Sequence, residues 1–302
     1  MSDEKKSTAL IHIDAGDWAK PANMLIEKIA DAIGGLAKPW QIKRVAEAES
    51  EAERIHTVAA IEITRLQKRA MTRLIAEEAR KQNNIESITA KALPQLESGA
   101  KPENVEDDWI ANFFDKSRLI SDEGMQELWA KVLAGEANQA GRFSKRTINH
   151  LASLDKADAA LFEKLCSFNF LLNVPSPLIY DTQAKIHTDH GINFGTLSHL
   201  ESIGFIQFNN LTYINIGPFP QKGYSSYFDE MVYLEFPDSN NCRLNVGKVR
   251  LTQIGEQLAP LCEAQPVEGF ADYVREKWRA WGYKTEPSQP EAGPPSGAAA
   301  PE

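Results

Sequence analysis

Residues 107–154 read DDWIANFFDKSRLISDEGMQELWAKVLAGEANQAGRFSKRTINHLASL, and this stretch decides the expected fold. Trp, Phe, Leu and Met recur in it at intervals of three and four residues, which places them on one face of a helix. The pair Asp107–Asp108 caps a first helix, and Ser121 caps a second. Gly135 ends the second helix, and Ser144 opens a third. The stretch predicts a compact helical module with an aromatic core, and it contains no catalytic motif.

The chain before this module carries the longest regular pattern. From Gln41 to Leu93, apolar and small side chains recur at alternating intervals of three and four, without a Gly or Pro to interrupt them. This pattern predicts one continuous helix of about 40–50 residues, roughly 60–75 Å long. A lone helix with such a stripe is not stable in water, so we expect it to contact another part of the chain or a second copy, as in a coiled coil. The residues assigned to an interface between copies are Ile55, Ile63 and Leu66.

The second half of the same pattern is basic. Arg65, Arg69 and Arg73 follow one another at intervals of four and form a ridge along the predicted helix. One interpretation is a solvated face that the acidic run Glu47–Glu53 of a neighbour balances, and we favour it. The alternative is a surface that contacts phosphates. In that alternative, the nucleic-acid-binding residues are Arg65, Lys68, Arg69, Arg73, Arg80, Lys81, Arg142, Lys145 and Arg146.

A shorter amphipathic segment precedes the long pattern. It begins at Pro21, a residue suited to the first turn of a helix, and the pair Gly34–Gly35 stops it. Helices that lie on membrane surfaces carry several basic residues on their polar face. This segment offers only Lys28 and Lys38, so we expect it to pack within the protein rather than on a membrane.

The C-terminal half changes character after Phe170, with fewer charges and shorter periods. A helix that ends at Gly204, short strands after it and a helix that begins near Thr252 resemble a winged-helix domain with an insertion at 217–228. A winged helix that reads DNA needs Arg, Lys, Asn or Gln on the helix before the wing. Residues 191–210 contain no Arg or Lys, so we expect a module for packing or protein contact.

The expected fold is mainly α with a C-terminal α+β part: a long N-terminal helix, a helical module and a winged-helix-like domain. The parts are a flexible N-terminus at 1–20, an amphipathic helix and the long helix at 21–98, the helical module at 103–170, the winged-helix-like domain at 171–264, an aromatic helix at 265–284 and a disordered tail at 285–302. Pro94–Pro102 has the composition of a linker.

Composition argues against several classes of protein. The net charge of −9 and pI near 5.3 are unlike the basic domains that usually bind nucleic acid along a whole chain. The three cysteines, Cys166, Cys242 and Cys262, have no CxxC spacing, so no disulfide framework is expected and a cytoplasmic location fits best. Cys166 is interpreted as a buried structural thiol. No apolar run is long enough to span a membrane.

No residue pattern favours catalysis. The motifs GxSxG, HExxH, GxxxxGK[ST] and GxGxxG are absent, and we expect no cofactor. His187, His190 and His199 have spacings that zinc accepts, but a fourth ligand is missing, so a polar loop before a helix is the favoured interpretation. A hydrolase whose site forms only in the fold stays open as a third class.

The run from VEDDWIANFF to DKADAALFEKL, with ARKQNNIESITAKAL upstream, resembles the bacterial family catalogued as domain of unknown function 2806. The likeness covers roughly residues 75–260 and is most secure at 105–170. ELWAKVLAGE followed by LSHLESIGFI and LTQIGEQL is also similar to the Abi-alpha group, which is linked to abortive phage infection. The first resemblance implies a fold and a bacterial origin, and the second implies a role in phage defence. Neither supplies functional residues.

Together these patterns predict a non-enzymatic interaction or regulatory protein that acts through self-association or a protein partner. The alternative is a nucleic-acid-binding protein that uses the basic ridge and the winged-helix-like domain.

Overall fold

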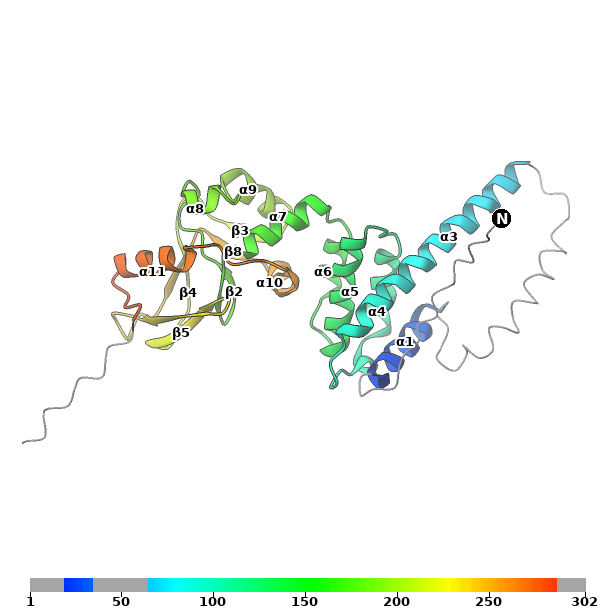
Figure 1. Ribbon diagram of the computed structural model, residues 1–302, viewed down its shortest axis with the longest axis horizontal. Coiled ribbons are helices and arrows are strands. Elements are labelled where there is room, and N and C mark those ends of the chain that lie inside the picture. Colours follow the sequence, from blue (N-terminus) through cyan, green and yellow to red (C-terminus); the bar gives the residue numbers. More distant parts are fainter. Residues whose placement is uncertain (1–18, 35–64, 287–302) are drawn as a thin grey trace, which may run out of the picture. The chain divides into compact units, whose positions relative to one another are not determined.

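The computed structural model describes residues 19–34 and 65–286 (Figure 1). The chain divides into two compact units, residues 1–156 and 157–302. The predicted flexible N-terminus and disordered tail lie almost wholly outside the described residues, and so do Ile55 and Ile63. The described part is mostly helical, with small antiparallel sheets towards the C-terminus, as the sequence predicts.

The N-terminal unit is built from helices. They are α1 (Ala19–Ile33), α3 (Arg65–Ala92), α4 (Asp107–Ser117), α5 (Glu123–Asn138) and α6 (Lys145–Leu151), with 3-10 turns η2 (Leu93–Gln95) and η3 (Pro102–Asn104) between α3 and α4. Phe113 lies at the centre of the core, where its ring contacts Trp109 and Trp129 at centroid distances of 5.1 Å each. The Trp109 indole N–H donates a 2.7 Å hydrogen bond to the Phe143 carbonyl, so the aromatic core also holds the loop before α6.

Three of the predicted helix ends are wrong. Asp107 and Asp108 do not cap α4 but form its first turn, since Glu106 is the N-cap residue and no side chain caps this helix. Asp122 caps α5, since its carboxylate accepts a hydrogen bond from the Met125 amide, whereas Ser121 uses its hydroxyl to contact Asn84. Gly135 does not end α5, which continues to Asn138. Gly135 serves packing instead, because a Cβ atom there would lie 2.7 Å from the Phe143 ring. The cap predicted at Ser144 is confirmed, with its side chain accepting from the Thr147 amide.

The segment predicted as a linker is packed. Leu96 and Pro102 are buried. The Lys101 amide donates to the Ala137 carbonyl, and the Glu97 amide donates to the Asn138 side chain. The Pro and Gly residues of this segment therefore mark a packed turn of the chain rather than a flexible linker.

The first helix packs as expected. Leu25, Ile26 and Ile29 on α1 are buried, and Lys28 forms a 2.6 Å ion pair with Asp107 of α4. The helix ends at Ile33, and Gly34 follows in the left-handed region that glycine tolerates. Its apolar face is thus covered by protein. Among the described residues, no helix is long and apolar enough to cross a membrane.

The C-terminal unit combines short helices with three small sheets. Its helices are α7 (Lys156–Cys166), α8 (Lys185–Thr188), α9 (Phe194–Ser202), α10 (Gln253–Leu258) and α11 (Phe270–Ala280). Its strands are β1 (Asn169–Leu172), β2 (Val174–Pro177), β3 (Ile206–Phe208), β4 (Ile214–Ile216), β5 (Lys222–Tyr227), β6 (Glu230–Glu235), β7 (Leu244–Gly247) and β8 (Val249–Leu251). One sheet has the order β2-β1-β5-β6, and the pairs β3-β8 and β4-β7 form the other two.

Helix α7 lies in this unit from residue 157 onward. The reason is contact: Phe162 of α7 stacks on Phe205 at 4.1 Å, and Asp158 pairs with His199 of α9. The predicted helix end at Gly204 and the predicted helix start near Thr252 are both present: Gly204 has a positive φ of 85°, and Thr252 caps α10.

The aromatic helix near the C-terminus closes the core of this unit. Phe270 and Trp278 of α11 are fully buried, and the Trp278 indole donates a 2.9 Å hydrogen bond to the Tyr180 hydroxyl. Beyond the helix, Lys284 pairs with Glu235 at the edge of the four-stranded sheet. The helix therefore packs onto its own unit, as we expected.

Candidate functional site

Helix α3 is covered along only part of its length. From Asn84 to Ala92 one face is buried, with Ile88 and Ala92 fully so. The earlier part, residues 65–83, contains no buried residue. Leu66, Met71, Leu74 and Ile75 are 67%, 53%, 52% and 56% exposed, respectively. We call these four side chains the apolar face of α3.

The exposed part begins where the neighbouring helices stop. The Asn84 side-chain amide donates to the Arg118 carbonyl and to the Ser121 hydroxyl, both in the turn between α4 and α5. One turn further on, the Ser87 hydroxyl donates to Gln126. Figure 1 shows the other end of α3 extending away from α4 and α5. No described helix therefore covers the apolar face of α3.

The basic ridge lies on this same projecting part. Residues 65–83 contain six basic and two acidic side chains. Arg73 contacts Glu77 at 3.6 Å, and Lys81 contacts Glu78 at 2.6 Å, which lowers the pKa of Glu78. Arg65, Lys68, Arg69 and Arg80 make no ion pair with any described residue. Most of the ridge is therefore open to a partner of opposite charge.

The second basic group, Arg142, Lys145 and Arg146, is placed by a buried carboxylate. Glu136 of α5 accepts hydrogen bonds from the amides of Gly141 at 2.6 Å and Phe143 at 2.8 Å, while burial raises its pKa. These bonds fix the loop that carries Arg142, whose guanidinium lies 5.4 Å from the Phe143 ring centroid.

The two basic groups do not form one patch. Asn84 marks the level at which α5 begins, and the projecting part of α3 lies beyond it. Arg142 follows the other end of α5, a helix of 16 residues and hence about 24 Å long. The nine residues assigned to nucleic acid thus fall at opposite ends of the N-terminal unit.

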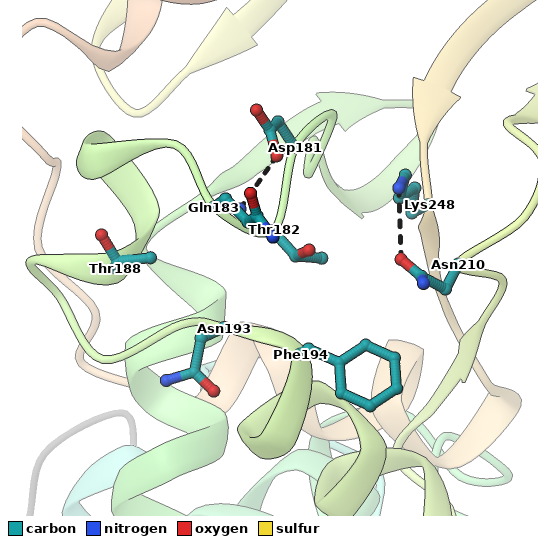
Figure 2. A pocket seen from close by; sticks show the side chains of 8 residues that line it. All are labelled: Asp181, Thr182, Gln183, Thr188, Asn193, Phe194, Asn210 and Lys248. Carbon is teal, nitrogen blue, oxygen red and sulfur yellow. Dashed lines mark hydrogen bonds between the residues drawn. The ribbon is translucent and has the colours of Figure 1, made fainter.

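A polar pocket of about 580 Å³ opens on the C-terminal unit (Figure 2). The Lys248 ammonium donates a 3.2 Å hydrogen bond to the Asn210 side chain, and the Asp181 carboxylate accepts from the Gln183 amide at 2.9 Å. The Phe194 ring, at the start of α9, is half exposed at its edge. The lining consists of Asp181, Thr182, Gln183, Thr188, Asn193, Phe194, Asn210 and Lys248. It offers one ammonium, one carboxylate and several neutral donors and acceptors.

Sequence reasoning missed this pocket. Its residues come from the loop before α8, the start of α9 and the turns beside β3 and β8, and no motif joins them. The only local signal was the N-cap of α9, where Asn193 accepts from the amides of Gly195 and Thr196.

The three histidines considered for zinc do not converge. His187 is fully buried, and its ring contacts those of Phe168, Phe270 and Tyr273 at 5.0, 5.8 and 5.6 Å. His199 instead pairs with Asp158 at 2.7 Å. Within residues 19–34 and 65–286, no group of three or more His, Cys, Asp or Glu side chains could hold a metal ion.

His187 is unusual for a buried histidine. Neither ring nitrogen has a hydrogen-bond partner among the described residues, and the nearby Tyr273 hydroxyl lacks one too. Burial lowers the pKa of His187 to about 4 and raises that of Tyr273 to about 12. The imidazole is therefore neutral in the folded protein near neutral pH.

Comparison with protein families places the chain. Residues 68–275 match the family described as "Protein of unknown function (DUF2806)", and the chain belongs to this family. The match begins on α3 and continues into α11, so it spans most of both units. The resemblance seen in the sequence is thus confirmed, whereas nothing supports the link to the Abi-alpha group. No curated protein and no solved structure matches the chain.

Proposed function

We propose that this protein is a non-enzymatic interaction protein that self-associates through the apolar face of α3. The observation that carries the proposal is the projecting half of α3, where four large apolar side chains are each more than half exposed. Large apolar side chains exposed to water favour association, because burying them releases about 25 cal/mol for each Å² covered. Leu66, assigned to the interface from the sequence, is one of the four.

The charge pattern favours a second copy as the partner. The projecting part of α3 carries six basic and two acidic side chains, and the sequence before it contains the acidic residues Glu47, Glu49, Glu51 and Glu53. In a parallel pair, the basic ridge of one copy would face that of the other. In an antiparallel pair, the acidic stretch of one copy lies beside the basic ridge of the other, which lowers the electrostatic energy.

Light scattering on the full-length protein tests the proposal. We expect a mass that is a multiple of 33.6 kDa, and we expect it to fall to that of one chain in the double variant Leu66→Ser, Leu74→Ser. The matched control is Leu211→Ser, Met231→Ser, which replaces two apolar residues of the C-terminal unit that are also more than half exposed, and it should leave the mass unchanged. A wild-type mass of one chain at all concentrations would overturn the proposal.

The C-terminal unit is assigned to protein contact. Its elements α7, β2, α8, α9, β3 and β8 follow one another in the order of a winged helix in which α9 precedes the wing, with β1 before β2 and β4–β7 inserted between β3 and β8. The exposed face of α9 is engaged: His199 pairs with Asp158, and Glu201 accepts from the Phe208 amide. With no Arg or Lys on α9, this helix is poorly suited to DNA. The cytoplasmic location and the role in phage defence are proposals of the same kind, and the latter rests only on the weaker resemblance.

The second candidate function is nucleic-acid binding, which the unpaired cations of the basic ridge favour. It predicts that the full-length protein retards DNA or RNA in a gel and that the affinity falls steeply with salt. The triple variant Arg65→Gln, Arg69→Gln, Arg73→Gln should bind more weakly. The slope of its log affinity against log salt concentration should fall by the amount expected for up to about three lost phosphate contacts. The control Arg142→Gln, Lys145→Gln, Arg146→Gln removes equal charge at the other end of the unit. No retardation at low salt would exclude this candidate.

A further inference from the structure

Two cysteines that lie far apart in the sequence meet in the C-terminal unit. Cys166 is the last residue of α7, and Cys262 directly follows the 3-10 turn η4 (Ala259–Leu261). Both cysteines line the same cavity, the Cys262 thiol contributes to the raised pKa of the Cys166 thiol, and neither cysteine is part of a disulfide. The fold thus brings together two thiols that are distant in the sequence and are not part of a CxxC motif.

The pair lies in an apolar pocket. A cavity of about 350 Å³ is lined by both cysteines and by apolar side chains that include Phe170, Leu171 and Phe228. Asn169, also in the lining, is a neutral polar residue. A small uncharged molecule can therefore approach the thiols without displacing a charged group.

The two thiols differ in access. Cys166 is only 3% exposed, whereas Cys262 is half-buried. Burial, with Cys262 as its neighbour, raises the pKa of the Cys166 thiol well above its usual range. A reagent from solution should therefore reach Cys262 first, while Cys166 keeps its proton until a reactive sulfur lies beside it.

We propose that Cys166 and Cys262 form a modification site at which hydrogen peroxide produces an intramolecular disulfide. The Cys262 sulfur attacks one peroxide oxygen, the O–O bond breaks, and the departing oxygen leaves as water with the thiol proton. The Cys166 sulfur then attacks the sulfenic sulfur of Cys262, the S–O bond breaks, and a second water leaves with the Cys166 proton. The two sulfurs together lose two electrons, which reduce the peroxide to two molecules of water.

The new bond would restrain the C-terminal unit. It would join the end of α7 to the segment after α10, and all eight strands lie between these two points in the sequence. A cross-link that closes such a long loop stabilises the folded state chiefly by restricting the unfolded chain. Oxidation should therefore raise the melting temperature of this unit, and a thiol reductant should reverse the rise.

Mass spectrometry tests the proposal, starting from the reduced, full-length protein and digesting it after oxidation and alkylation. After treatment with hydrogen peroxide, the protein is denatured and its remaining thiols are alkylated. We expect a single alkylated cysteine, Cys242, and a peptide pair joined through Cys166 and Cys262, with a mass about 2 Da below that of the two thiols. Dithiothreitol should restore three alkylated cysteines.

Variants separate the roles of the two sulfurs. Cys166→Ala should leave Cys262 as a sulfenic acid that a dimedone probe captures, and Cys262→Ala should leave Cys166 unreacted. Cys242→Ala is the matched control, since its thiol lies apart and contacts the carbonyls of Asp238 and Ser239, and it should cross-link like the wild type. Three alkylatable thiols after oxidation, or Cys262 oxidised to sulfinic acid without a cross-link, would overturn the proposal. The main measurement uses the wild-type protein, so the proposal can still be overturned if a variant fails to fold.

Discussion

The projecting half of α3 and the aromatic core around His187 depart from the usual arrangement of proteins in opposite directions. On α3, large apolar side chains such as Leu66 and Ile75 are exposed to water. In the core of the C-terminal unit, the two ring nitrogens of His187 and the hydroxyl of Tyr273 are buried without partners among the described residues.

The two departures differ in what they cost the fold. An exposed apolar side chain lacks the favourable free energy of burial but introduces no strain. The folded chain therefore stays intact, and the exposed side chain favours association. A buried polar group without a partner loses its hydration, and the loss grows when the group is charged. The first departure therefore indicates a partner, whereas the second indicates a dependence of stability on pH.

The largest expected effect contrasts two isoleucines of one helix. Ile88→Ala removes a fully buried side chain and should lower the free energy of unfolding of the N-terminal unit by about 2–5 kcal/mol. Ile75→Ala acts on the projecting half of α3 and should change that free energy by less than about 0.5 kcal/mol. Urea unfolding at a concentration where the chain is monomeric measures both, with hydrogen exchange assigning the change to the unit. Equal effects would show that the projecting half is covered in solution.

A second expectation concerns pH. His187 has a pKa of about 4 in the folded protein and one near 6.5 when unfolded. The unfolded chain therefore binds more protons between these values. The contribution of His187 to stability is complete above pH 6.5 and is lost as the pH falls towards 4, by up to about 3 kcal/mol.

The matched variant is His187→Leu, which replaces the imidazole with an apolar side chain of similar size that cannot take up a proton. Its unfolding free energy should fall less than that of the wild type between pH 7 and pH 4.5, because the group that takes up the proton is gone. The difference between the two proteins is the quantity to measure, since the carboxylates shared by both then cancel. Parallel pH profiles would contradict a neutral, unpaired His187.

Much of the helical structure could be predicted because its signals are local. The cap at Ser144 and the left-handed Gly204 depend on atoms within a few residues, and both were correctly predicted. Gly135 was not, because its role is contact with Phe143 on the following loop. The position of a glycine indicates a helix end only when no neighbouring side chain requires the space.

The strands β1, β2 and β5 were harder to predict. Leu171 of β1 and Val174 of β2 are exposed, and β5 has the sequence KGYSSY, so none of these strands shows a clear apolar alternation. The hairpins β1–β2 and β5–β6 become one sheet only through the pairing of β1 with the distant β5, as in the register of Leu171 with Ser226. Such pairing leaves little trace in the sequence of either strand.

The candidate sites also divide into features that local sequence sets and features that contacts between distant segments set. The sequence by itself determined the family, the helical pattern of α3 and its basic ridge, and it assigned Leu66 to the proposed interface. Only the tertiary structure decided that no described helix covers residues 65–83, that the two basic groups lie apart, and that Cys166 and Cys262 line one cavity. The physical reason is range: helix periodicity and capping are set within about one turn, whereas burial and contact depend on segments that only folding brings together.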